Sequence, residues 1–380
     1  MKSEKKSAII MGIIIVGLVI GVSTSLSYVE SESSSQVQTD TGNIDSMMEK
    51  DKPKVSSIDK SRFKNAPKLL GISGYINTTP EELQKMIDGK VVLYDIWTYS
   101  CINCIRTLPY ITAWDETYAD QGLLIIGIHS PEFEFEKEFD NVAQAVQKYG
   151  INYPVVLDND KKIWKAFENR YWPRKYIADH EGFIRYDHIG EGAYQETERV
   201  IKELLEERAQ FLGLNVASTE SYVQIDEFEH SAFRTPELYF GYEFATGRNQ
   251  LGSKEGFNPG NVVEYNFPVG NIQQNYFYMD GTWENLKGSM KLKSDDGSII
   301  LSYRAKEVNI VTANEADLQI LIDGEIIDPS ISGKDVGTQG RIHVHDDGLY
   351  NIVNSNQSEQ HLLQILVNDP GFEIYTFTFG

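Results

Sequence analysis

The chain of 380 residues contains only two cysteines, Cys101 and Cys104, which stand at Cys-x-x-Cys spacing. They follow residues 91–97, a β-branched and aromatic run that predicts a buried strand. After Cys101, apolar residues recur every three or four positions as far as Tyr118, which predicts a helix. A lone pair at such a junction is typical of a dithiol that opens and closes as a disulfide.

The expected helix places Cys101 at or near its amino-terminal turn. Unpaired backbone N–H groups and the positive end of the helix dipole favour a thiolate there, and the thiolate is the nucleophile. Cys104 lies about one turn further on and faces the same way, so it is expected to close the disulfide.

Asp95 is the one charged residue within the strand. A buried carboxylate is costly unless it has a partner or a task. Six residues before Cys101, it is expected to lie behind the cysteines and accept the proton of Cys104. The alternative is an aspartate at the strand end that points to solvent.

These residues together resemble the thioredoxin superfamily. The motif positions of that family match Asp95, Trp97, Cys101, Cys104 and the helix-kinking Pro109. Pro173 matches the family's cis-proline, which lies beside the dithiol and docks substrate backbone. The resemblance therefore implies a docking edge made by Trp172 and Pro173, with Trp97 close by.

Three segments look more narrowly like the extracytoplasmic carboxy-terminal part of DipZ-type thiol–disulfide proteins: residues 97–109, 172–192 and 375–380. This resemblance covers roughly residues 66–380. The segment before Pro173 is also similar to extracytoplasmic thioredoxins of the TlpA and ResA kind. The multi-span electron-transfer domain of DipZ-type proteins does not precede this module, so a separate membrane electron donor is implied. Ile102-Asn103 replaces the Gly-Pro of thioredoxin, so the potential and direction of exchange do not carry over.

Other uses of the cysteine pair fit less well. Zinc needs four ligands, and no second cysteine pair or well-spaced histidine accompanies this one, so no metal is expected. A purely structural disulfide stays open as an alternative, although so short a ring removes little chain entropy. A peroxiredoxin-like enzyme would attack with a cysteine in another motif. His129, at a strand end, is expected to be a hydrogen-bonded structural residue, and Arg106 a solvated helix charge.

The net charge of −21 argues against nucleic acid as a partner, because phosphate binding needs a basic patch. No Walker loop or dinucleotide-binding glycine motif stands out, so no cofactor is expected. The thiols must then exchange electrons with another protein.

Residues 1–30 are expected to be a membrane anchor or a signal segment. Three lysines precede an apolar run over residues 8–22, followed by a mostly uncharged stretch to Val29. The length and the lack of an Ala-x-Ala site favour an uncleaved anchor over a cleaved signal and secretion. Lysines before the run and acids after it place the later domains outside the cytoplasm. Residues 31–64, rich in Ser, Gln, Asp and Lys, are expected to be a disordered linker.

Strands alternating with helices over residues 65–212 predict an α/β thioredoxin-like domain, with a central mixed sheet covered on both faces. Thr79-Pro80-Glu81-Glu82 predicts a helix start with a capping box. Residues 213–380 predict an all-β sandwich or jelly roll, with turns at residues 295–297, 323–324 and 346–348. Its strands are expected at residues 237–244, 262–267, 298–303, 308–312, 318–322, 342–345 and 364–367.

The DipZ-type counterpart of this second domain resembles a carbohydrate-binding module. The aromatic residues Tyr276, Phe277, Tyr278 and Trp283 either stack on a glycan or belong to the core. His343 and His345 alternate on one strand, but no third metal ligand accompanies them.

The expected function is that of a membrane-tethered, extracytoplasmic thiol–disulfide oxidoreductase acting on protein disulfides or dithiols through Cys101 and Cys104. The alternative is a surface protein that binds carbohydrate or protein and uses the thioredoxin fold as a scaffold.

Overall fold

The computed structural model describes residues 59–214, 221–230, 234–245 and 247–380. The expected anchor, and most of the expected linker, lie outside these ranges. Within them, no helix is both long enough and apolar enough to cross a membrane.

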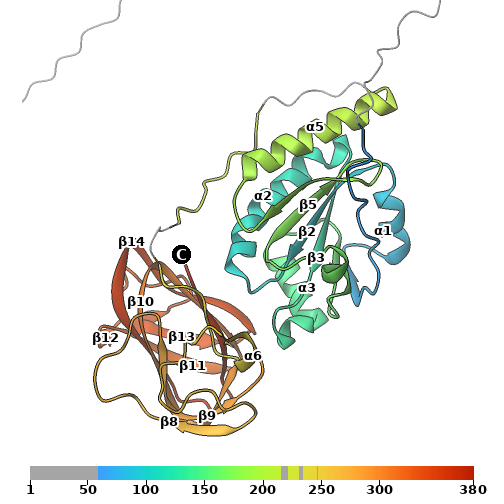
Figure 1. The fold of residues 1–380 in the computed structure, drawn as a ribbon. Helices are drawn as coiled ribbons and strands as arrows, with labels where there is room; N and C mark the ends of the chain where they lie inside the picture. The colour runs from blue at the N-terminus through green and yellow to red at the C-terminus, as the bar shows by residue number, and fades with distance from the viewer. Residues whose placement is uncertain (1–58, 215–220, 231–233, 246) are drawn as a thin grey trace, which may run out of the picture. The chain divides into compact units, whose positions relative to one another are not determined.

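The first half of the described chain is an α/β unit around a mixed sheet with strand order β1-β4-β3-β2-β5-β6 (Figure 1). Strands β2, β3 and β4 are parallel to one another, and β1, β5 and β6 pair antiparallel. The strands are β1 Gly74–Ile76, β2 Val91–Trp97, β3 Leu123–His129, β4 Val155–Leu157, β5 Arg174–Ala178 and β6 Ile184–Ile189. The helices are α1 Pro80–Ile87, α2 Ile102–Tyr118, α3 Phe139–Lys148, α4 Lys162–Ala166 and α5 Tyr194–Leu212, with 3₁₀ turns at Ala119–Gln121 and Glu134–Lys137. The predicted thioredoxin-like sheet with helices is confirmed.

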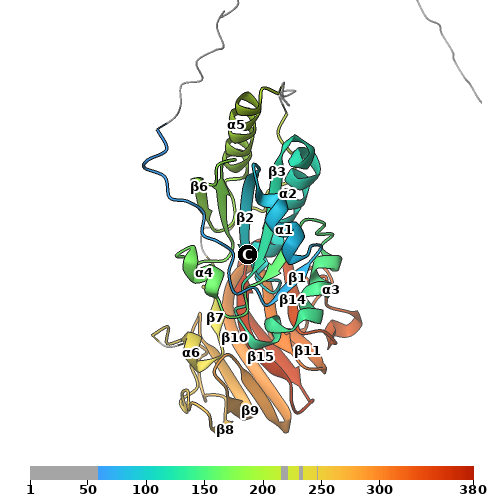
Figure 2. The ribbon, with the colours of Figure 1, turned by 90° about the vertical axis from the view of Figure 1, so that its right-hand side faces the viewer.

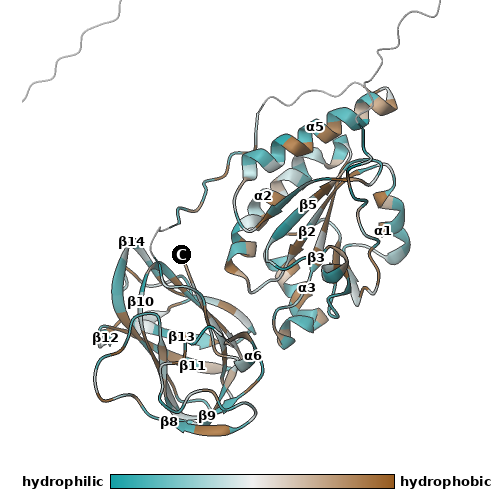
Figure 3. Cartoon of the chain, viewed as in Figure 1, coloured by the Kyte–Doolittle hydropathy of each residue, from teal (hydrophilic) through white to brown (hydrophobic). Residues whose placement is uncertain are grey.

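Strand β2 is buried along its whole length, and its alternate residues enter two different cores. Val91, Leu93 and Trp97 belong to the core that contains apolar residues of α2, α3 and α5. Val92, Tyr94 and Ile96 belong to the core formed with α1 and α4. Because side chains alternate along a strand, Asp95 projects from the same face as Leu93 and Trp97, toward α2. Figure 3 shows apolar residues along β2 and β3 and polar residues on the outer faces of the helices.

Helix α1 begins as its sequence predicts. The Thr79 hydroxyl accepts a hydrogen bond from the Glu82 N–H, and the Glu82 carboxylate accepts one from the Thr79 N–H. Pro80 is the first helical residue, where its missing N–H costs nothing.

The second half of the described chain is a large all-β region. Its central strands are long, and β10 pairs along its length with β14, β15 and β9 (Figure 2). Its elements are β7 Leu238–Tyr239, α6 Tyr242–Ala245, β8 Val262–Tyr265, β9 Phe277–Asn285, β10 Met290–Ala313, β11 Ala316–Ile322, β12 Glu325–Ile326, a 3₁₀ turn at Thr338–Gly340, β13 Arg341–Val344, β14 Gly348–Val367 and β15 Glu373–Phe379.

The turn predicted at residues 295–297 is wrong, because these residues lie within β10. From Gly297 onward, β10 pairs with both β9 and β14, and the β9 pairing shifts register between Leu292 and Gly297. A Cβ at Gly297 would lie 2.6 Å from Leu292 and 2.8 Å from Trp283. This glycine therefore permits close packing at an irregularity in the strand, where sequence patterns alone suggest a turn.

Two other local predictions met different outcomes. The predicted turn at residues 323–324 is present between β11 and β12, with φ of 54° and 87°. The strand predicted at residues 237–244 is confined to β7, and helix α6 follows it. Strand β7 is held by two residues of β15, so its length is set by a partner far away in the chain.

The aromatic residues considered for glycan stacking are mostly core residues. Phe277 and Trp283 are fully buried and belong to the β-region core, and Tyr278 is buried as well. Tyr276 is half-buried. The core interpretation of this cluster is therefore the better one.

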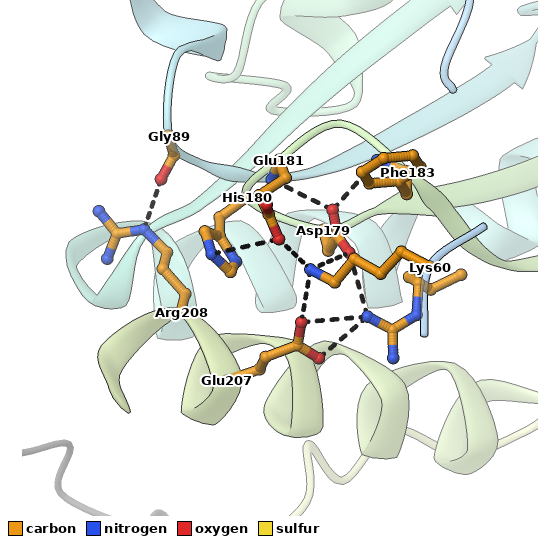
Figure 4. Close-up of polar contacts among 9 residues, drawn as sticks. Lys60, Gly89, Asp179, His180, Glu181, Phe183, Glu207 and Arg208 are labelled. Atoms are coloured by element: carbon orange, nitrogen blue, oxygen red, sulfur yellow. Dashed lines mark hydrogen bonds and ion pairs between the residues drawn. The ribbon is translucent and has the colours of Figure 1, made fainter. Parts of the chain in front are cut away.

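A charged network joins the start of the described chain to α5 (Figure 4). The Lys60 ammonium group lies 2.9 Å from Asp179 and 2.8 Å from Glu207, and it also pairs with Glu181. Arg185 pairs with Asp179 at 3.0 Å and Glu207 at 2.9 Å. Two cations thus lie among three acidic groups that would otherwise suit a metal ion.

Replacing Lys60 by methionine should lower the free energy of unfolding by about 1–3 kcal/mol, since the buried Asp179 loses one of its cations. Hydrogen bonds from Lys60 and Arg185 hold the pKa values of Asp179 and Glu207 below their ordinary 3.8 and 4.5, although burial acts the other way. The stabilisation is therefore complete above those ordinary values and is lost as pH falls through the lower folded-state values. Chemical denaturation of the full chain across pH 2–7 measures both effects. Lys64→Met is the control, because its partner Glu168 is as exposed as Lys64 and an exposed pair contributes little.

Candidate functional site

Cys101 and Cys104 occupy the first turn of α2, as the sequence predicts. Cys101 is the N-cap residue, and its Sγ accepts a hydrogen bond from the Cys104 N–H at 3.4 Å. Its side chain is partly exposed, whereas Cys104 is 1% exposed. The two sulfurs therefore differ in their access to solvent, and only Cys101 can react directly with a group outside the protein.

Burial raises the pKa of the Cys104 thiol well above its ordinary value. The contact with Cys101 and the negative charge of Asp95 raise this pKa further, while the Thr98 backbone lowers it. Cys104 therefore stays a thiol at neutral pH until a nearby base removes its proton.

Asp95 does not point to solvent. It is 1% exposed, and its Oδ1 has no hydrogen-bond partner among the described residues. Burial raises the pKa of its carboxyl to about 7, and the charge of Lys175 opposes that rise. A carboxyl that titrates near neutral pH behind a buried thiol is suited to accept and return a proton.

A buried glutamate, Glu136, holds the loop between β2 and α2 in place. Ser100 Oγ donates to Glu136 Oε1 at 2.5 Å, and Glu136 Oε2 accepts from the N–H groups of Glu132 and Phe133. Glu136 is fully buried, and burial raises its pKa. Through Ser100, the residue next to Cys101, this side chain fixes the path of the backbone into the dithiol.

His129 is a structural residue, in agreement with its interpretation from sequence. It is fully buried, its Nε2 lies 3.3 Å from Thr98 Oγ1, and its ring stacks on Tyr99. Burial lowers its pKa to about 3, so it is neutral at physiological pH.

The segment around Pro173 returns to the dithiol along β5. The Trp172–Pro173 peptide is cis, as the resemblance implies. Ile96 pairs with Arg174, so the antiparallel register brings Pro173 beside the end of β2, where the dithiol loop begins. The Trp172 indole donates to the Ser130 carbonyl at 2.8 Å. This hydrogen bond fixes the position of the Trp172 ring.

Two other residues lie elsewhere than expected. Trp97 is completely buried, so a direct docking contact is closed to it, and we assign it to the packing behind the site. Arg106 is not a solvated helix charge: its side chain is 11% exposed, pairs with Glu307, and stacks 3.5 Å from the Phe228 ring centroid.

Sequence reasoning missed Glu136 and Lys175. Both are fully buried ionisable side chains, and neither belongs to the cysteine motif. The sequence gives little signal for either: Lys175 follows Arg174, another cation, and Glu136 stands in the acidic stretch of residues 132–138.

Two family models match the chain. Residues 75–187 match the AhpC/TSA family, and residues 235–380 match the family described as thioredoxin-like C-terminal domain. The first range contains the dithiol and Asp95, and the second contains most of the all-β region.

Curated relatives agree with these models. Protein DipZ of Mycobacterium bovis is 34% identical over 318 residues, which is 83% of this chain and 43% of that protein. NHL repeat-containing protein 2 of Bos taurus is 44% identical over 120 residues, or 31% of this chain and 16% of that protein. Thiol-disulfide oxidoreductase YkuV of Bacillus subtilis is 28% identical over 143 residues, or 37% of this chain and 94% of that protein.

The chain thus spans less than half the length of the DipZ protein that it matches. The match nevertheless runs across both halves of the described structure, and the YkuV match spans nearly all of that oxidoreductase. The chain therefore combines a thioredoxin-like domain, which matches the AhpC/TSA family model, with a thioredoxin-like C-terminal domain, and 83% of its length is similar to Protein DipZ.

Proposed function

We propose that this protein is a thiol–disulfide oxidoreductase that exchanges disulfides with protein substrates through Cys101 and Cys104. The observation that carries the proposal is the unequal burial of the two sulfurs at the start of one helix. An exposed sulfur beside a buried one suits a reaction in which the first attacks and the second resolves.

In the proposed reaction, the Cys101 thiolate attacks one sulfur of a substrate disulfide, and the other substrate sulfur leaves as a thiolate. Cys104 gives its proton to Asp95 and then attacks Cys101, which releases the second substrate sulfur. The substrate gains two electrons, and the protein is left with a Cys101–Cys104 disulfide. The opposite direction uses the same steps in reverse.

The backbone at Trp172 and Pro173 is proposed to dock the substrate. The register that brings this segment beside the dithiol loop supports the role, as does the fixed indole of Trp172. Substrate access is then to Cys101 first, since Cys104 has almost no exposed surface.

A redox titration of the full chain tests the proposal against the static-disulfide alternative. Equilibration with glutathione or dithiothreitol buffers, followed by alkylation of free thiols, should give one reversible two-electron transition. Its midpoint should lie between about −120 and −270 mV, the range of catalytic dithiols. A pair that stays oxidised below about −300 mV would be a structural bridge and would favour a binding protein built on a thioredoxin scaffold.

We further propose that the protein is tethered to the membrane by residues 1–30 and works outside the cytoplasm. The charge asymmetry around the apolar run over residues 8–22 supports this placement. The electron donor would then be a separate membrane protein. Membrane fractionation together with protease accessibility of the region after residue 59 tests the placement, and release of the chain into the medium would favour signal cleavage instead.

A further inference from the structure

Lys175 is the one lysine or arginine among the described residues that is buried. It is completely buried, and it stands among the largest side chains that have no exposed surface. It lies on β5 directly across from Asp95 on β2, since the two residues are partners in the antiparallel register. Directly opposite residues have Cβ atoms about 4.5–5.5 Å apart and project from the same face of the sheet.

The other neighbour of Asp95 in the sheet has no side chain. Asp95 pairs with Gly127 on β3, and a Cβ there would lie 3.1 Å from Trp97 Nε1 and 3.2 Å from the Tyr153 ring. The carboxyl is therefore flanked by a glycine on one side and a lysine on the other. The positive charge of Lys175 lowers the pKa of the Asp95 carboxyl, against the effect of burial.

Lys175 has few other partners. Its Nζ donates to the Gly190 carbonyl at 3.3 Å and lies 5.6 Å from the centre of the Tyr194 ring. Neither group carries a negative charge, and the carboxylates whose charges act on the ammonium are Asp95 and, more weakly, Glu191. An ammonium group without a counter-charge in a protein interior is costly, so the charge of the cross-strand neighbour Asp95 lowers this cost.

We propose that Lys175 is a positioning residue for disulfide exchange, whose ammonium group keeps the Asp95 carboxyl ionised so that it takes the proton of Cys104. This inference rests on the exchange reaction proposed above. It adds that the charge needed for that reaction comes from the strand that carries the docking segment, two residues after Pro173.

The step that depends on Lys175 is the second one. Starting from a mixed disulfide on Cys101, the Cys104 S–H bond breaks and its proton passes to an Asp95 oxygen. The Cys104 sulfur then forms a bond to the Cys101 sulfur, and the bond from Cys101 to the substrate breaks. The electron pair leaves on the substrate sulfur as a thiolate.

The titratable groups that face this pair come from every element around it. They are Cys104 on α2, Tyr153 before β4, His188 on β6, Glu191 after β6, and Tyr194 on α5. Burial lowers the pKa of Lys175 to about 8, while the charges of Asp95, Cys104 and Glu191 act in the other direction. Lys175 is therefore largely charged at pH 7 and able to act on Asp95.

The test follows the resolving step directly in the full-length protein with 5,5′-dithiobis(2-nitrobenzoate). The reduced protein releases one nitrothiobenzoate when Cys101 attacks and a second when Cys104 resolves, so the two phases separate in absorbance. In Lys175→Met, the second phase should slow at least tenfold at pH 7. In a plot of its rate against pH, the rise in rate should move to higher pH by one unit or more. The first phase should stay within twofold, because it needs only Cys101.

Lys85→Met is the matched control, since this exposed lysine lies on α1 on the other side of the sheet. It should leave both phases unchanged. Lys175→Gln, which keeps a polar group without the charge, serves if the methionine variant does not fold, and it should show the same slowing. Unchanged second phases in both Lys175 variants would overturn the proposal.

A second readout separates the role of Lys175 from the proposed function itself. The titration of the Asp95 carboxyl carbon by ¹³C NMR, assigned through its loss in Asp95→Asn, should move to higher pH in Lys175→Met. If the wild-type protein shows no second phase, the exchange reaction is refuted, and this titration still decides whether Lys175 controls Asp95.

A double variant tests whether Lys175 acts through Asp95. When Lys175→Met is added to Asp95→Asn, the rate of the second phase should change by less than twofold, and a larger change would mean that Lys175 acts by another route.

Discussion

Replacing Cys101 by serine should lower disulfide-exchange activity by more than about 10³-fold, because a serine hydroxyl is not ionised at neutral pH and forms no mixed disulfide. Replacing Cys104 by serine should have a different outcome. Cys101 is partly exposed and still attacks, but no buried sulfur remains to resolve the product. Covalent complexes with substrate proteins should then accumulate.

The measurement for this prediction is non-reducing electrophoresis of the Cys104→Ser chain expressed in cells, followed by identification of the captured proteins. The complexes should disappear on reduction. The Cys101→Ser/Cys104→Ser chain is the control and should capture nothing. Exchange activity in Cys101→Ser comparable to that of the wild-type protein would refute the assignment of the attacking sulfur.

Replacing Asp95 by asparagine should slow the resolving step by about 10²-fold at pH 7, the usual contribution of a positioned base. The same change should alter stability. Burial raises the pKa of Asp95 from 3.8 to about 7, so the folded state holds this proton more tightly than the unfolded state. That stabilisation is complete below pH 3.8 and is lost as pH rises through about 7.

The wild-type protein should therefore lose at most about 4 kcal/mol of stability between pH 4 and 7 through this group, and Asp95→Asn should not. Denaturant unfolding of both proteins at each pH measures the difference, which cancels the contribution of other titrating groups. The asparagine also leaves Lys175 without its carboxylate, which changes stability at every pH. The two proteins are therefore compared by how steeply the free energy of unfolding changes with pH, not by its value at one pH. Parallel curves for the two proteins would show that Asp95 is not perturbed.

The sequence predicts the α/β half well because its signals are local. The apolar run of β2, the spacing of α2 and the capping box at Thr79 each involve residues within one or two turns of each other, and each is present. The all-β half is predicted less well. Residues 295–297 have the composition of a turn but lie inside β10, because pairing with β9 and β14 outweighs local preference.

The same division applies to the site. Cys101, Cys104 and Asp95 are found through spacing within ten residues of one another. Lys175 lies far along the chain from Asp95, and only the β2–β5 register reveals that the two face each other. Glu136 reaches Ser100 from a 3₁₀ turn that no periodic pattern announces. Buried charges of this kind depend on tertiary neighbours, which one sequence does not specify.

Strand β5 connects the proposed docking segment to the lysine behind the dithiol. Pro173 immediately precedes this strand, Lys175 lies within it, and the Pro173 carbonyl accepts a hydrogen bond from the N–H of Gly190, whose own carbonyl holds the lysine. The backbone proposed to dock a substrate and the Lys175 ammonium group therefore belong to one short segment that Gly190 holds at two points. If a substrate docks on this backbone as proposed, a shift of the segment on docking would also move the Lys175 ammonium group relative to Asp95.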